Sequence, residues 1–324
     1  MTSKNSPISP ALDPAGFPPS PLPAGRVRGP AVFLDYDQAE LDAVYDQNAY
    51  APNRAQVLAR YASASDEVRR RIGAPKRLRY GPSAIEQLDW FASDAKNAPV
   101  LVFVHGGAWR SGAAAEYAFP AEFLVRSGVH CVVPDYTNVI EQQGNLMPMA
   151  QQVQAALAWV IENASLHGGD AQRVYVCGHS SGAHLVSAAL VGDWRASDWQ
   201  ASHGLAQTAI RGGLLISGMY DLRGPRLSAR SQYVNFTDAI EDALSAQRHI
   251  ARLQVPLTLV YGSMETPEFQ RQSWSFAQAL QQAGKPVRLI RAEGYNHFEI
   301  AETLASPFAA AGRAALAMMG LGDA

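Results

Sequence analysis

The chain has 324 residues, of which 48% are hydrophobic and 17% charged, and its formal net charge is −2. This balance is typical of a globular protein with a large core, and the absence of any long Lys/Arg run argues against nucleic acid or an anionic membrane as a partner. No apolar run approaches the roughly 20 residues that span a bilayer, and no disulfide framework is expected from two cysteines in apolar runs.

Residues 1–30 differ in composition from the rest of the chain. Eight prolines occur between Pro7 and Pro30 without any periodicity. Because proline fixes φ and removes a backbone donor, this segment is predicted to be an extended arm that joins neither a helix nor a central strand. We expect it to lie outside the folded domain of residues 31–324, and its removal to leave activity nearly intact.

The elements predicted after the arm begin with helices over 35–75 and a hairpin whose strands are 77–81 and 87–92. Buried strands and helices then alternate. We predict strands at 99–104, 128–136, 173–180, 212–218, 256–262 and 285–292, and helices at 115–128, 147–165, 181–192, 268–284 and from near 297 to about 319. This order predicts an α/β fold with a mostly parallel central sheet and helices on both faces. Residues 220–255 are less regular, and a small cap over the sheet is expected there.

The sequence CGHSSGAHL lies between a predicted buried strand and a predicted helix. Within it, Gly178-His179-Ser180-Ser181-Gly182 matches the G-x-S-x-G pattern, in which a sharp strand-to-helix turn presents the central serine at its apex. Ser180 is therefore the predicted nucleophile. The backbone N–H of Ser181 can begin the helix and also face a developing oxyanion.

A second glycine motif, HGGAW, follows an earlier buried strand. Acyl transfer needs preorganised donors where the carbonyl oxygen becomes negative, and backbone N–H groups of glycine can approach that oxygen closely. Gly106 and Gly107, with Ser181, are the predicted oxyanion donors. On the substrate side, His105 is expected to hold the loop by hydrogen bonds, and Trp109 to line or cover the pocket.

A serine hydroxyl needs a base to become a good nucleophile. In folds with a G-x-S-x-G turn, the acid and then the histidine follow the serine along the chain. His297 follows the last predicted strand and is the expected general base. His184 is expected to be structural. For the acid we favour Glu265, three residues after the penultimate strand, with Asp221 as a rival and Glu268 as a third possibility that is also well suited to a helix N-terminus.

The segments HGGAW, GHSSGAHL, ISGMYDL, ETPEFQRQSWSFAQAL and NHFEI occur in the order and context seen in kynurenine formamidases (arylformamidases) of the α/β-hydrolase superfamily. The chain resembles that family from about residue 35 to 319. The resemblance implies Ser180 as nucleophile, His297 as base and the acid at the position of Glu265, where animal members have aspartate; this departure keeps Asp221 as a rival.

The resemblance also implies an activity, the hydrolysis of N-formyl-L-kynurenine through an acyl-enzyme. A wider carboxylesterase or amidase, acting on aryl or short-chain esters, carbamates or other amides, is the alternative, and a binding protein without catalysis is a third. No metal or organic cofactor is expected, because no metal-ligand cluster or nucleotide-binding motif is present. The expected partner is a small-molecule substrate, with a homodimer possible, and the expected location is the cytoplasm.

Overall fold

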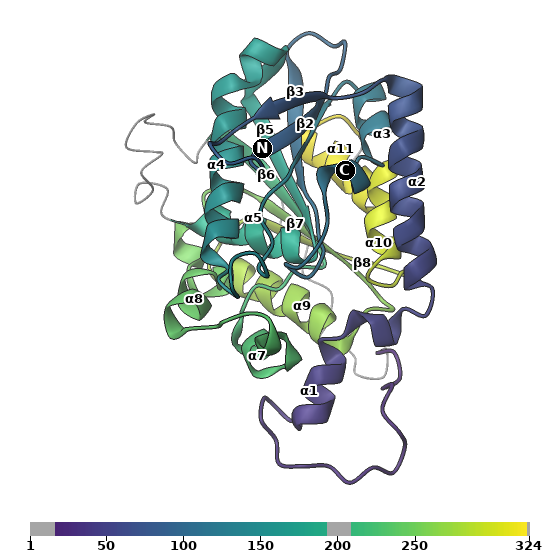
Figure 1. Cartoon of the computed structure of the whole chain (residues 1–324), viewed down its shortest axis with the longest axis vertical. Coiled ribbons are helices and arrows are strands. Elements are labelled where there is room, and N and C mark those ends of the chain that lie inside the picture. The colour runs from purple at the N-terminus through teal and green to yellow at the C-terminus, as the bar shows by residue number, and fades with distance from the viewer. Residues whose placement is uncertain (1–16, 193–208, 323–324) are drawn as a thin grey trace.

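An eight-stranded sheet forms the centre of the protein in a computed structural model that describes residues 17–192 and 209–322 (Figure 1). Its strand order is β1-β2-β4-β3-β5-β6-β7-β8. The first two strands form the predicted antiparallel hairpin, β2 pairs antiparallel with β4, and all later neighbours are parallel. The strands are β1 (Lys76–Arg79), β2 (Gln87–Phe91), β3 (Ala98–Val104), β4 (His130–Pro134), β5 (Gly169–His179), β6 (Ile210–Ile216), β7 (Leu257–Gly262) and β8 (Val287–Ala292).

Helices cover both faces of the sheet, as predicted. The α-helices of the described residues are α1 (Gln38–Val44), α2 (Arg54–Ile72), α3 (Ala121–Arg126), α4 (Met147–Asn163), α5 (Ser181–Val191), α7 (Arg223–Leu227), α8 (Asp238–Ala243), α9 (Pro267–Gln282), α10 (Glu299–Glu302) and α11 (Ala310–Met319). The central strand β3 is apolar and buried along its whole length because alternate side chains enter different cores. Val100, Val102 and Val104 of β3 pack with α4, α5 and α9, whereas Leu101 and Phe103 pack with α2, α3 and α11.

Two predicted helices are shorter than expected. The helix predicted over 115–128 begins as a short 3-10 turn, and only α3 is α-helical. Pro120 is the N-cap residue of α3. The helix predicted from near 297 to 319 is divided into α10, a 3-10 turn and α11. Pro307 lies in the gap, where it has no backbone N–H to donate and cannot continue a helix.

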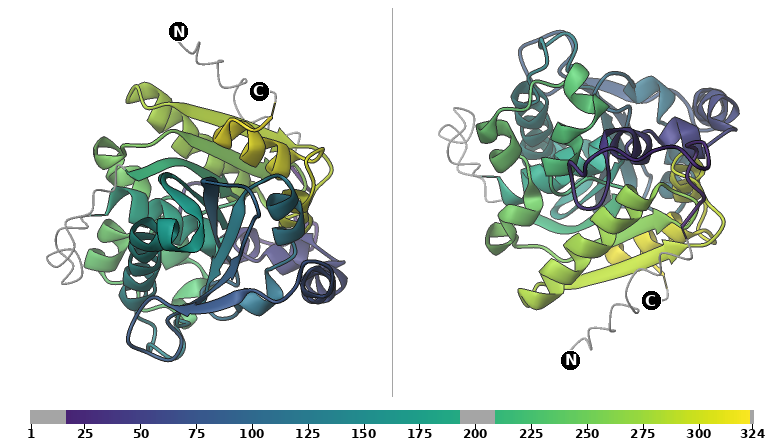
Figure 2. Two further views of the ribbon diagram at one scale, coloured as in Figure 1. Left: turned by 90° about the horizontal axis from the view of Figure 1, so that it is seen from above. Right: turned by 90° about the horizontal axis from the view of Figure 1, so that it is seen from below.

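The segment predicted as a cap consists of short helices, among them α7, the 3-10 turn Ala229–Gln232 and α8. These helices follow the carboxyl end of β6. Seen from below, the N-terminal segment with α1 lies beside them across the same end of the sheet (Figure 2). The two segments meet through hydrogen bonds from Ala229 N to Asp42 Oδ1 and from Gln38 Nε2 to the Leu227 carbonyl.

No helix in the described residues is both long enough and apolar enough to cross a membrane. Cys131 and Cys177 are both buried and unpaired. Burial raises the pKa of each thiol.

Candidate active site

Ser180 stands at the turn between β5 and α5 in an unusual backbone conformation. Its φ of 56° and ψ of −123° lie outside the regions that non-glycine residues normally adopt. Such strain persists only where the surrounding structure enforces it, and it is typical of functional sites. Here the Ser180 N–H is fixed by the Ile216 carbonyl at the end of β6, and the Ser180 carbonyl accepts from His184 N as α5 begins.

Both glycines of the motif are required by close backbone packing. A Cβ on Gly178 would lie 2.6 Å from the Gly182 carbonyl oxygen, and a Cβ on Gly182 would lie 2.2 Å from the carbonyl oxygens of Val104 and His105. The turn therefore needs residues without side chains on either side of Ser180. The same contact brings the loop after β3 against the first turn of α5.

His297 lies between Ser180 and Glu265 and is hydrogen-bonded to both. Its Nε2 is 2.8 Å from Ser180 Oγ, and its Nδ1 is 2.8 Å from Glu265 Oε2. A carboxylate only accepts, so the proton lies on Nδ1 and the Nε2 lone pair faces the serine hydroxyl. Ser180, His297 and Glu265 are buried, with Ser180 6% exposed. The structure thus brings together the three residues that the sequence predicted, in the geometry of a nucleophile, a base and an orienting acid.

Glu265 is fully buried, and each of its oxygens has a donor. Oε1 accepts from Gly262 N at 2.7 Å and from Ser217 Oγ at 2.5 Å, while Oε2 faces His297. A buried carboxylate is tolerated only when it is hydrogen-bonded in this way. The side chain turns back to the end of β7, where Gly262 N binds one oxygen and leaves the other for His297.

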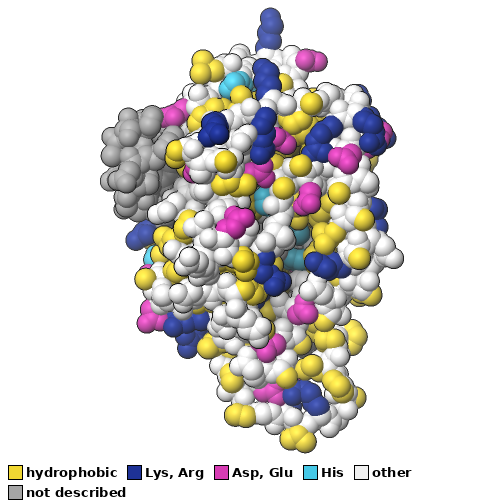
Figure 3. All heavy atoms as spheres, viewed as in Figure 1, with side chains coloured by type: hydrophobic (Ala, Val, Ile, Leu, Met, Phe, Trp, Pro, Cys, Tyr) yellow, Lys and Arg dark blue, Asp and Glu magenta, His cyan; other side chains and the backbone are white. Residues whose placement is uncertain are grey.

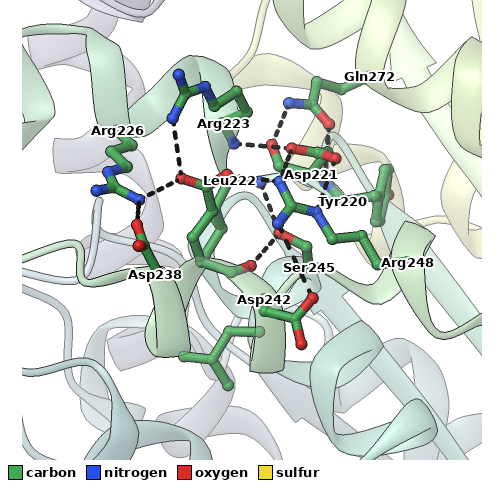
Figure 4. Close-up of polar contacts among 12 residues, drawn as sticks. Tyr220, Asp221, Leu222, Arg223, Arg226, Asp238, Asp242, Ser245, Arg248 and Gln272 are labelled. Carbon is green, nitrogen blue, oxygen red and sulfur yellow. Dashed lines mark hydrogen bonds and ion pairs between the residues drawn. The ribbon is translucent and has the colours of Figure 1, made fainter.

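The rival acids lie in other networks. Asp221 is paired with Arg248 (3.2 Å) and accepts a hydrogen bond from Arg223 N (Figure 4). Arg248 is also paired with Glu241. Glu268 accepts from the Tyr45 hydroxyl and pairs with Arg271. Neither carboxylate is hydrogen-bonded to His297, so Glu265 is the acid that contacts the imidazole.

The three predicted oxyanion donors gather around Ser180. The N–H groups of Gly106, Gly107 and Ser181 have no backbone acceptor among the described residues. A Cβ on Gly106 would lie 3.2 Å from Ser180 Cβ, which places the loop beside the nucleophile. Gly107 has a φ of +125°, and a Cβ there would lie 1.9 Å from the Ser111 carbonyl oxygen, so only glycine fits. The arrangement can present backbone donors to an oxygen held at Ser180.

His105 and Trp109 are not among the residues that line the cavity, although both were predicted on the substrate side, and His105 holds the loop by a hydrogen bond as expected. His105 is buried behind the loop, where its ring stacks on Tyr136 with centroids 4.5 Å apart and its Nδ1 is 2.8 Å from the Gly106 carbonyl oxygen. Trp109 is 1% exposed and donates from Nε1 to His184 Nδ1. Positive φ values at Ala108 and Trp109 turn the chain inward at this point. Both side chains therefore support the loop from beneath.

His179 is a supporting residue that the sequence did not assign. Its Nε2 donates to the carbonyl oxygen of His297 at 2.8 Å, and the two imidazole centroids are 5.0 Å apart. Burial, with a smaller contribution from His297, lowers the pKa of His179 to about 3, so its ring is neutral. His179 thus fixes the backbone of the residue whose side chain faces Ser180.

A cavity of about 640 Å³ opens onto Ser180 and His297. This volume is within the range of small-molecule sites. Figure 3 shows the hollowed face, with Lys and Arg side chains at its margin and His side chains visible inside. Its walls come from the arm, from residues 39–58, from the loop after β3 and from residues 228–233. The lining residues include Pro21, Leu22, Asp42, Tyr45, Asp46, Gln47, Arg54, Leu58, Arg110, Tyr117, Arg230, Tyr233 and Phe298.

Most of this lining could not be predicted from the sequence. The arm was expected to be loose or draped on a surface and dispensable for activity, and Pro21 and Leu22 reach the cavity. Arg26 and Gly29 hold the arm by hydrogen bonds to Asp37, which is 3% exposed. Residues 1–16 of the predicted arm lie outside the described residues. The only sequence signal for the other wall was the irregular composition of 220–255. No cluster of three His, Cys, Asp or Glu side chains suited to a metal occurs in residues 17–192 and 209–322.

Comparisons with known proteins agree with this geometry. The BD-FAE family model matches residues 88–224. A kynurenine formamidase of Danio rerio is 30% identical over 290 residues, covering 82% of this chain and 90% of the relative, and the Mycobacterium tuberculosis esterase LipC is 28% identical, covering 70% and 60%. Among solved structures, a Silicibacter protein has a TM-score of 0.71 at 24% identity, covering 83% of this chain and 96% of that one. Thermogutta terrifontis esterase 2 has a TM-score of 0.64 at 20% identity, covering 78% and 97%.

The two structural likenesses establish the α/β-hydrolase fold, and the named relatives are hydrolases of formamide or ester substrates. The identity to the Danio rerio enzyme extends over nearly the whole length of that relative. The chain is therefore a hydrolase with the α/β-hydrolase fold and belongs to the kynurenine formamidase family.

Proposed function

We propose that this protein hydrolyses aryl formamides of the N-formyl-L-kynurenine type through a Ser180–His297–Glu265 triad. The observation that carries the proposal is the continuous hydrogen-bonded chain from Glu265 through His297 to Ser180, which ends at the cavity. The similarity to a kynurenine formamidase across most of both chains supports the formamide as substrate.

In the proposed reaction, Ser180 Oγ attacks the formyl carbon and its proton passes to His297 Nε2. The negative oxygen of the tetrahedral intermediate accepts hydrogen bonds from the N–H groups of Gly106, Gly107 and Ser181. The C–N bond then breaks as His297 Nε2–H protonates the leaving aryl amine, which leaves a formyl ester on Ser180. Water gives a proton to His297, attacks this ester and releases formate, and the proton returns to Ser180. Glu265 stabilises the imidazolium that forms in each half of the reaction.

A carboxylesterase of wider scope is the second candidate. The same donors and nucleophile serve an ester, and the relative LipC is an esterase. The two candidates differ in which leaving group the cavity accommodates, so their kcat/KM values for matched substrates separate them.

The test is a substrate panel on wild type and Ser180→Ala. It contains N-formyl-L-kynurenine, formanilide, p-nitrophenyl acetate and p-nitrophenyl butyrate. We expect kcat/KM for N-formyl-L-kynurenine to equal or exceed the ester values, and Ser180→Ala to lower every value by at least about 10⁴-fold. Ester values higher by orders of magnitude would select the esterase. A fluorophosphonate probe should label the wild type and should not label Ser180→Ala. An unlabelled wild type, or a labelled Ser180→Ala, would contradict the assignment of Ser180 as the nucleophile.

A further inference from the structure

Arg230 is a buried cation without an acidic partner on the wall of the catalytic cavity. The residue is 9% exposed and lines the same cavity as Ser180 and His297. Within residues 17–192 and 209–322, neither a hydrogen bond nor an ion pair joins its guanidinium to a carboxylate. Because a buried charge is costly unless it is paired, a position of this kind favours a ligand that brings the opposite charge.

The protein itself uses only part of the guanidinium. Nη1 donates to the Tyr233 hydroxyl at 3.0 Å and Nη2 to the Tyr45 carbonyl oxygen at 2.9 Å, while Nε has no acceptor. A guanidinium has five N–H donors in a planar fork that matches a carboxylate. These two bonds fix the orientation of the fork and leave donors unused.

Aromatic rings hold the guanidinium close to the catalytic histidine. Its carbon is 5.4 Å from the Trp109 ring centroid and 5.8 Å from that of Phe269. The same Phe269 ring lies 4.7 Å from the His297 imidazole in an edge-to-face contact. Arg230 and His297 therefore border one phenyl ring, close enough for a single aryl substrate to reach both.

The other charged groups of the cavity are already engaged or lie further out. Asp42 Oδ1 accepts from Ala229 N and Asp46 Oδ1 accepts from Asn48 N. Arg54 lies over the Phe298 ring, and the exposed Arg110 lies over the Tyr233 ring at 4.2 Å. Arg230 is thus the buried cation of this cavity, and Arg110 is an exposed one beside it.

We propose that Arg230 is a specificity-determining residue that binds a carboxylate on the leaving-group side of the substrate. This assignment rests on the proposed function for the nature of the scissile bond. It makes the enzyme selective for aryl formamides whose amine half carries a carboxylate over those that are neutral, because only the former supplies the missing counter-charge.

The experiment compares N-formyl-L-kynurenine with its primary carboxamide, which differs only in the charge of the carboxyl group. We expect wild type to prefer the carboxylate by roughly 30-fold in kcat/KM, the size of a charge-assisted hydrogen bond in a buried site. Arg230→Gln should abolish this preference, mainly through a higher KM for the carboxylate. Equal preference in Arg230→Gln and wild type would overturn the proposal.

Two further variants separate binding from structural support. Arg230→Lys keeps the charge and should retain part of the preference, whereas a purely structural role would make it as damaging as Arg230→Gln for both substrates. Arg110→Gln removes a neighbouring exposed cation and should change the preference less than about threefold. Loss of the preference in Arg110→Gln alone would assign the carboxylate to Arg110 and overturn the proposal for Arg230.

A parallel ester pair keeps the test independent of the formamide activity. It consists of an aryl acetate with a carboxylate on the phenol half and the corresponding carboxamide. If formamides are not hydrolysed but the ester pair shows the Arg230-dependent preference, the proposed function fails and the carboxylate site stands. If formamides are hydrolysed and neither pair shows the preference, the proposed function stands and the carboxylate site fails.

Discussion

His297 Nδ1 lies 2.8 Å from Glu265 Oε2, a contact between residues from the loops that follow two neighbouring parallel strands, β8 and β7. The carboxyl ends of parallel strands meet at one edge of the sheet, and Ser180 reaches the same edge from β5. This contact favours the His297 tautomer that carries its proton on Nδ1, and a substitution of Glu265 tests this role.

Glu265→Gln should lower kcat by roughly 10³- to 10⁴-fold, because an amide can also bond the imidazole in the wrong tautomer and does not stabilise the imidazolium. Asp221→Asn should lower it less than about threefold, since Asp221 is partly exposed and paired with Arg248. Steady-state rates of both variants on one substrate decide the matter. A larger loss in Asp221→Asn would reassign the acid.

Stability should decrease as the pH falls from about 6.5 towards 4. Burial lowers the pKa of His179 to about 3 and that of His184 to about 4, below the ordinary value of 6.5. Below pH 6.5 the unfolded chain takes up protons that these buried rings exclude in the folded state, so the free energy of unfolding decreases. At pH 5 the cost is about 2 kcal/mol for each histidine.

The measurement is urea unfolding at pH 7 and pH 5. At pH 7, His184→Leu should be less stable than wild type, because Trp109 Nε1 loses its acceptor. The decrease in the free energy of unfolding from pH 7 to pH 5 should be about 2 kcal/mol smaller in His184→Leu than in wild type. Ser187→Ala, on the same helix and without a titratable group, is the matched control and should keep the wild-type change. An unaltered change in His184→Leu contradicts the argument.

Gly182→Ala should impair both folding and catalysis. Its Cβ would lie 2.2 Å from the carbonyl oxygens of Val104 and His105, so the loop that carries Gly106 must move away from Ser180. We expect a loss of about 3 kcal/mol in stability and at least about a tenfold lower kcat. Gly212→Ala is the control, because the close neighbours of its Cβ would be atoms of the flexible Met318 side chain, with Tyr175 at an ordinary contact distance of 3.5 Å. Thermal unfolding and rates that are equal in the two variants would contradict the close approach.

Removal of residues 1–30 should raise KM several-fold, in contrast to the sequence-based expectation that activity survives nearly intact. Pro21 and Leu22 line the cavity, and loss of Arg26 leaves Asp37 without its ion pair. The arginine holds the pKa of the Asp37 carboxyl well below its usual range. Leu22→Ala isolates the lining contribution and Arg26→Gln the anchoring contribution. Unchanged KM and thermal stability in the truncated protein would show that the arm has no part in the site.

The sequence by itself determined the fold class and two of the residues that meet at the candidate site, Ser180 and His297, and it favoured Glu265 among three possible acids. Hydrophobic runs separated by helical patterns specify a parallel sheet, and the topology of such a sheet places the ends of β5, β7 and β8 at one edge. The G-x-S-x-G and HGG motifs are local, since they require particular backbone conformations at Ser180 and Gly107, and therefore remain legible in a single chain.

Only the tertiary structure decided which acid contacts His297 and what surrounds the cavity. Asp221, Glu265 and Glu268 all lie after strands that end at the same edge of the sheet. Their partners come from other segments of the chain, such as Arg248 for Asp221 and Ser217 for Glu265. The cavity wall depends in the same way on contacts between the arm, α1 and residues 228–233, as in the bond from Arg230 to the Tyr45 carbonyl. No sequence periodicity encodes such contacts, because they arise from the packing of segments separated by up to 223 residues.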